Sequence, residues 1–148
     1  MITTHQLQPV AVLSLSLLFA QLVTAQPPAA NLIGTWTAVS ATIDGRPLDA
    51  ETVKQLRLTL TADRYKSERG GQVLFDSTYR VDTAKSPPHI DMIGTEGELK
   101  DKAAPGIYQL DGDTLQLCYV MPGKDRPTAF ASTPQSGAFL IVYQRVIK

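Results

Sequence analysis

Hydrophobic and polar residues alternate along much of the chain beyond residue 30. The run Leu56–Ala62 places three leucines on one side and Arg57, Thr59 and Thr61 on the other. A period of two is typical of a β-strand with one buried face. Similar runs, separated by turn sequences at spacings of about ten residues, predict further strands. These runs are Gly34–Ile43, Tyr65–Glu68, Gln72–Asp82, His89–Ile93, Gly106–Leu110, Thr114–Met121 and Ala138–Ile147.

The segments between these runs carry residues that favour turns and short helices. The triplet Asp111-Gly112-Asp113 predicts a hairpin turn between two strands. Residues Asp49–Gln55 predict one or two helical turns, with Asp49 as the N-cap. The polar segment 94–105 and the proline-containing segment 122–137 are expected to be irregular connections.

This succession of short strands with a single short helix predicts an all-β domain. The expected architecture is an antiparallel, up-and-down β-barrel of about eight strands. The last run, AFLIVYQRVI, is apolar on both faces, and a free sheet edge of that kind invites aggregation. Pairing of the last strand with the first removes this edge, so we expect a closed barrel rather than an open sandwich.

Closure brings the first and last strands side by side. Trp36, the only tryptophan, lies near the start of the first strand, and Arg145 lies near the end of the last. We expect the guanidinium to stack on the indole at one end of the barrel, an interaction worth about 0.5 to 2 kcal/mol. Gly34, Trp36 and Arg145 are therefore the expected barrel-closing structural residues.

The first residues of the chain predict a signal peptide over 1–25. The apolar run Val10–Val23 is shorter than the roughly 20 residues of a bilayer span, and small residues before Gln26 fit cleavage after Ala25. Residues 26–30 form a proline-rich lead expected to be disordered, and 31–148 form the barrel domain. The expected location is secreted or periplasmic, with no membrane span after cleavage.

Charge and cysteine content exclude several classes of protein. The chain has 14 basic and 14 acidic side chains and no net charge, which argues against nucleic-acid binding because that requires a basic face. Cys118 is the only cysteine, so an intramolecular disulfide is impossible. Within the apolar run TLQLCYV, Cys118 is expected to be a buried small hydrophobic residue.

Two resemblances support the barrel. Gly34-Thr35-Trp36 with a late arginine resembles the G-x-W and terminal-arginine signature of lipocalins. The blocks LIGTW, DGRPL, KSPPHIDM, PGIYQLDGDTLQLCYV and RPTAF, followed by QR, resemble a family of small exported domains common in planctomycetes and related bacteria. The match spans Leu32 to Arg145. It implies a lipocalin-like fold and no established activity.

An eight-stranded barrel is either filled by its own side chains or wide enough for one small ligand. We expect a small, largely apolar ligand in the interior. Tyr108 and Tyr119 flank a hairpin and either face this ligand or pack across the strands. Arg126 either selects anionic groups at the barrel mouth or anchors its loop on backbone carbonyls. The candidate ligand-binding residues are Leu58, Tyr79, Tyr108, Tyr119 and Arg126.

No catalytic, metal or cofactor site is expected. His89 and Asp91 lie on one strand face and form the type of pair used in acid–base chemistry, but no nucleophile motif or second nearby histidine accompanies them. A hydrolase or isomerase is the exception left open. The expected function is that of an exported binding domain, and the alternative is a solid-core structural or protein-interaction module of the cell envelope.

Overall fold

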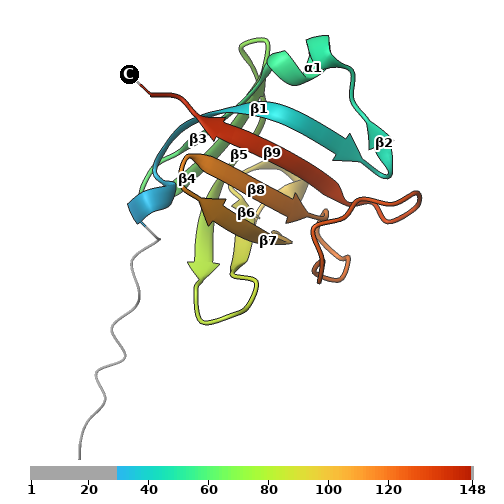
Figure 1. The fold of residues 1–148 in the computed structure, drawn as a ribbon. Coiled ribbons are helices and arrows are strands. Elements are labelled where there is room, and N and C mark those ends of the chain that lie inside the picture. Colours follow the sequence, from blue (N-terminus) through green and yellow to red (C-terminus); the bar gives the residue numbers. More distant parts are fainter. Residues whose placement is uncertain (1–29, 148) are drawn as a thin grey trace, which may run out of the picture.

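A computed structural model describes residues 30–147, and the expected signal peptide lies outside them. The described residues form a closed antiparallel β-barrel (Figure 1), which confirms the predicted all-β fold. The strands of the barrel wall are β1 (Gly34–Ile43), β3 (Leu56–Leu60), β4 (Arg64–Arg69), β5 (Gln72–Asp82), β6 (His89–Gly94), β7 (Ala103–Asp111), β8 (Thr114–Tyr119) and β9 (Phe139–Arg145).

Each wall strand pairs with its neighbour in the chain, and β9 returns to pair with β1. Figure 1 shows β1 and β9 side by side along most of their length. Their register runs from Trp36 opposite Arg145 to Ile43 opposite Phe139. The two-residue strand β2 (Arg46–Pro47) pairs only with the end of β1. The sheet therefore closes through β9, the strand whose apolar faces led us to expect closure.

The one α-helix of residues 30–147, α1 (Ala50–Lys54), lies in the connection between β1 and β3. Asp49 caps it, as predicted, because its Oδ1 accepts a hydrogen bond from the Thr52 amide at 2.8 Å. Two 3₁₀ turns complete the described residues, η1 (Ala30–Leu32) and η2 (Gly97–Leu99). Within residues 30–147, no helix has the length and apolar character needed to cross a bilayer.

The main core fills the inner face of the barrel. The leucines of β3 point inward as their alternation predicts: Leu58 has no exposed surface and Leu60 has 2%. The largest side chains with almost no exposed surface are Trp36, Tyr65, Tyr143, Leu32, Leu58, Leu60, Met92, Ile107, Leu117 and Cys118. Most of these belong to one continuous apolar cluster inside the barrel.

A second, smaller cluster lies on the outer face of β7, β8 and β9. Cys118 and Ile107 are fully or almost fully buried there, together with Val120 and Ala138. Phe130, from the long connection before β9, packs against this cluster. The connection therefore covers the outer apolar face of the last strands. Cys118 is buried, as the sequence predicted.

The ends of several strands differ from the sequence-based expectation. Strand β7 begins at Ala103, so the expected loop 94–105 is shorter and contains η2. Ala103 and Ala104 pair with β6, and Ala104 is buried at 1% exposure, although neither residue favours strands. At the other end of the domain β9 stops at Arg145, and Ile147 is 75% exposed.

Candidate ligand-binding site

One end of the barrel is sealed by Trp36 and Arg145. The guanidinium carbon of Arg145 lies 4.1 Å from the indole centroid, and Trp36 itself has no exposed surface. The indole Nε1 donates to the Leu32 carbonyl at 3.1 Å. A Cβ at Gly34, where φ is +149°, would approach Arg145 Nη1 to 2.9 Å. The positive φ and the close approach of the arginine therefore favour glycine at position 34.

Three of the expected ligand-binding residues meet inside the barrel. Leu58, Tyr79 and Tyr108 belong to the inner cluster and are 0%, 7% and 5% exposed. The Tyr79 hydroxyl donates its proton to the Thr61 carbonyl at 2.6 Å, so this proton is not available to a ligand. Tyr119 packs at the edge of the same cluster and stacks on Phe139, with ring centroids 4.8 Å apart. These side chains pack against one another in the interior of the barrel.

The structure places Arg126 apart from these four residues. Its Nη1 donates to the carbonyls of Gly106 and Ile90 at 2.8 and 3.2 Å, and its Nη2 pairs with Asp91 at 2.7 Å. Asp91 lies on the outer wall, because its neighbour Ile90 belongs to the inner cluster. Arg126 thus makes the contacts of a loop anchor, the second of the two roles considered from the sequence.

The hollow beside Arg126 is polar. It has a volume of about 440 Å³ and is lined by Arg80, Val81, Asp82, His89, Asp91 and Arg126. Arg80 also pairs with Asp91, at 3.3 Å. Burial, with the positive charges of Arg126 and Lys85, lowers the pKa of His89. Asp91 is thus shared by two arginines rather than held by His89 in an acid–base pair.

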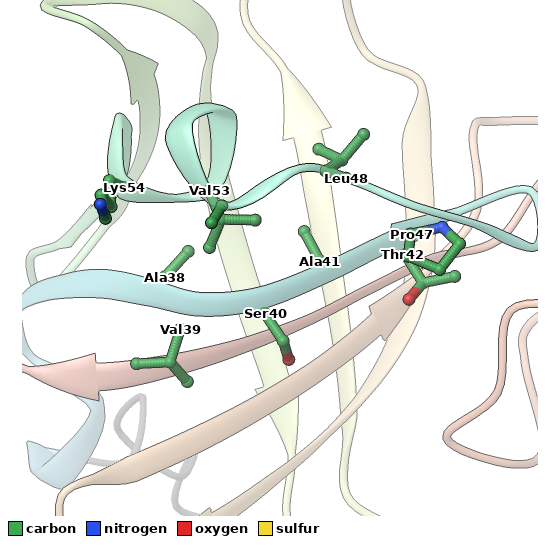
Figure 2. Close-up of a pocket in the computed structure, with 10 residues that line it drawn as sticks. Ala38, Val39, Ser40, Ala41, Thr42, Pro47, Leu48, Val53 and Lys54 are labelled. Carbon is green, nitrogen blue, oxygen red and sulfur yellow. The ribbon is translucent and has the colours of Figure 1, made fainter.

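A groove at the opposite end of the barrel from Trp36 was not expected from the sequence. It has a volume of about 490 Å³ and lies between the second half of β1 and the segment 47–54. Figure 2 shows Ala38 and Ala41 pointing toward Val53 and Leu48, whereas Val39 and Ser40 point away. The lining residues are Ala38, Val39, Ser40, Ala41, Thr42, Pro47, Leu48, Ala50, Val53 and Lys54.

The course of β1 explains this groove. Strand β1 pairs with β3 only as far as Thr37, and the β1–β9 register shifts between Ala38 and Ser40. The segment with α1 fills the space beside β1, held by the Leu48 amide, which donates to the Ala41 carbonyl at 2.9 Å. The small inward residues Ala38 and Ala41 leave room beneath it. In a regular strand Ala38 and Ala41 would face opposite sides, so the sequence carried no signal for this groove.

Hydroxyl groups gather on the inner wall of the barrel. Tyr65 and Ser77 are opposite each other on β4 and β5, and both are buried. Tyr143, on β9, is opposite Ala38 of the groove. Burial, with the neighbouring Tyr143 and Tyr119, raises the pKa of Tyr65 well above its ordinary value of 10.0. Burial likewise raises the pKa of Tyr143 and of Tyr119.

Within residues 30–147, no group of three or more histidine, cysteine or acidic side chains is placed to hold a metal ion. Comparisons of the chain with protein-family models, with curated proteins and with solved structures gave no match.

Proposed function

We propose that this domain binds a small, largely apolar molecule at the open end of the barrel, between β1 and segment 47–54. The observation that carries the proposal is the groove of about 490 Å³, which lies within the usual range for small-molecule sites of roughly 300 to 1,000 Å³. Its deeper side consists of apolar side chains of the inner cluster, Ala38, Ala41 and Val53. The opposite end of the barrel is closed by Trp36 and Arg145.

The proposal includes export and excludes catalysis. The signal peptide expected over 1–25 would place the domain in the periplasm or outside the cell. A carrier of apolar molecules is useful in such aqueous compartments because these molecules dissolve poorly in water. A lipocalin-like domain that binds its ligand without chemical change needs no nucleophile, metal or cofactor.

Paired substitutions on β1 test the binding site. Ala41→Leu adds volume toward Val53 and Leu48. Val39 also borders the groove, but its side chain points away from it, so Val39→Leu adds its volume outside. The probe is N-phenyl-1-naphthylamine, a neutral dye whose fluorescence rises in apolar sites. We expect Ala41→Leu to weaken dye binding about tenfold, a loss of about 1.4 kcal/mol, and Val39→Leu to leave it unchanged.

Native mass spectrometry of protein purified from its natural host is the second measurement. A retained small molecule supports the proposal. Absence of a retained molecule, together with equal dye binding by the two β1 variants, would overturn it.

A solid-core interaction module is the second candidate. A pair of exposed apolar side chains on β5 favours it: Val73 and Leu74 are 49% and 51% exposed. They line a hollow of about 410 Å³ with the segment 94–99. Exposed apolar clusters often mark protein contacts. Under this alternative, Leu74→Asp would abolish partner binding at the cell envelope, and no small molecule would accompany the purified protein.

A further inference from the structure

Two buried hydroxyl groups in the barrel make no hydrogen bond of good geometry among the described residues, and the Tyr65 hydroxyl has only the hydroxyl of Tyr143 beside it. They are the Tyr65 hydroxyl and the Ser77 hydroxyl, on side chains that are 1% and 0% exposed. A buried polar group without a partner keeps the full cost of its lost hydration, and such groups are rare in folded proteins. A pair of them in one place points to a partner that comes from outside the chain.

The two hydroxyls belong to one cluster. Tyr65 and Ser77 are directly opposite on neighbouring strands, so their Cβ atoms are about 4.5 to 5.5 Å apart and their side chains share the inner face. Tyr143 reaches the same region from β9, because its hydroxyl interacts with that of Tyr65. The cluster thus joins β4, β5 and β9 across the interior.

One member of the cluster, Tyr143, lies beside the groove. Tyr143 is opposite Ala38 on the paired strands β9 and β1, and Ala38 lines the groove. The side chains of Ala38 and Ala41 are small, so little side-chain volume separates the groove from Tyr143. Segment 47–54, which covers the groove, contacts β1 through the Leu48–Ala41 hydrogen bond and the short β2 pairing.

The surroundings of the cluster are uncharged. Arg64, Lys66 and Asp76 alternate with Tyr65 and Ser77 along β4 and β5, so their side chains point to the outer face, where Arg64 pairs with Asp76 at 2.6 Å. An anionic group placed here would lose its hydration and meet no cation, which is strongly unfavourable. Burial raises the pKa of Tyr65 and Tyr143, so both phenols keep their protons and act as donors at neutral pH. The cluster therefore offers donors to a neutral acceptor.

We propose that the hydroxyls of Tyr65, Ser77 and Tyr143 bind the carbonyl oxygen of a neutral, otherwise apolar ligand whose hydrocarbon part occupies the groove. Ketones, esters, lactones and quinones have this chemistry. This inference rests on the proposed function, since it names the chemistry of the ligand for the same end of the barrel. A carboxylate ligand is not expected, because the cluster contains no cation to pair with it.

A matched set of probes tests the inference. The probes are 2-nonanone, nonane and nonanoate, each competing with N-phenyl-1-naphthylamine for the protein. They share the same carbon number and differ only in the polar group. We expect 2-nonanone to bind about tenfold more tightly than nonane, because one net hydrogen bond to a buried donor is worth about that factor. Nonanoate is expected to bind more weakly than 2-nonanone.

Tyr65→Phe and Tyr79→Phe are the matched variants. Both remove one hydroxyl from a buried tyrosine, but only the Tyr79 hydroxyl makes a hydrogen bond of good geometry, to the Thr61 carbonyl at 2.6 Å. Tyr65→Phe is expected to keep or raise the stability of the free protein and to lower the preference for 2-nonanone over nonane from about tenfold to about threefold, because the hydroxyls of Ser77 and Tyr143 remain. Tyr79→Phe is expected to lower stability and to leave that preference unchanged.

Infrared spectroscopy of 2-nonanone labelled with carbon-13 at the carbonyl measures the wavenumber of the carbonyl stretch. This wavenumber reports hydrogen bonding to the carbonyl rather than packing of the hydrocarbon chain. The carbonyl stretch of the bound ketone is expected at lower wavenumber than in hydrocarbon solvent, and Tyr65→Phe is expected to reverse part of that shift.

Equal binding of 2-nonanone and nonane, or a preference for nonanoate, would overturn this inference while leaving the groove as a binding site. If none of the three displaces the dye and Ala41→Leu has no effect, the proposed function fails as well.

Discussion

Arg145 lies over the ring of Trp36, with its guanidinium carbon 4.1 Å from the indole centroid. The two residues are opposite each other in the β1–β9 pairing that closes the barrel. Arg145 Nε also contacts Asp113 at 3.0 Å, and Nη1 donates to the Ile33 carbonyl at 2.9 Å. One side chain thus joins the last strand to the first strand, to the β7–β8 turn and to the chain before β1.

We expect Arg145→Ala to lower the free energy of unfolding by about 2 kcal/mol, because it removes the stacking on Trp36 and the packing of the side-chain stem. The measurement is urea unfolding followed by the fluorescence of Trp36, the only tryptophan. The folded protein should show the blue-shifted emission of a buried indole.

Arg80→Ala is the control for this substitution. Its side chain is 70% exposed and makes one ion pair with Asp91, and such surface pairs contribute about 0 to 1 kcal/mol. Equal effects of Arg80→Ala and Arg145→Ala, with red-shifted emission from the folded protein, would contradict the role given to Arg145.

The wall of the barrel could be predicted because each strand carries its own signal. The alternating leucines of 56–60 identify an inner face without reference to the rest of the chain. Aspartate and glycine at 111–113 define the β7–β8 turn. Closure was predicted from the last strand, because a strand that is apolar on both faces invites aggregation when its edge is free. The inner face packs in the barrel, and Phe130 covers part of the outer face beside Leu140.

The groove and the site of Arg126 could not be predicted, because they depend on contacts between distant segments. The β1–β9 register shift after Ala38 has no mark in the local sequence. Arg126 lies in a long connection, and only the fold brings it to the carbonyls of Ile90 and Gly106. The start of β7 at Ala103 was missed for the same reason, since pairing with β6 overrides the weak strand preference of alanine.

Arg126→Ala is expected to lower the free energy of unfolding by about 2 kcal/mol. Asp91 loses its closest partner, and two backbone carbonyls lose a charged donor. Arg126→Lys should recover only part of this, because an ammonium group cannot reproduce the fork of donors. The measurement is urea unfolding, paired with dye titration. Dye affinity should not change, and a loss of affinity at unchanged stability would instead assign Arg126 to the ligand.

Cys118 should react with thiol reagents only when the outer cluster opens. The residue has no exposed surface, and burial raises the pKa of its thiol. Its Sγ lies 3.5 Å from the Ala131 carbonyl in the connection that covers it. Phe130→Ala is expected to increase the rate of labelling about tenfold by favouring local opening. The rate in denaturant gives the fully exposed limit, and rapid labelling of the native protein would contradict the burial of Cys118.

Alkaline pH is expected to unfold the barrel through its tyrosines. In the unfolded chain these phenols lose their protons near pH 10, whereas in the folded protein the pKa of Tyr65, Tyr119 and Tyr143 is raised by burial. Above pH 10 the unfolded state therefore binds fewer protons than the folded state, and stability falls as pH rises.

Each of these three phenols contributes a loss of about 1.4 kcal/mol per pH unit, so together they remove about 4 kcal/mol per unit between the unfolded and folded pKa values. The full contribution is present below pH 10. Far-ultraviolet circular dichroism and tyrosinate absorbance, recorded against pH, should change in one shared step. Tyr65→Phe removes one of the three protons and should move this step to higher pH. Gradual appearance of tyrosinate near pH 10 with an unchanged dichroism spectrum would mean that water reaches the interior hydroxyls in the native barrel.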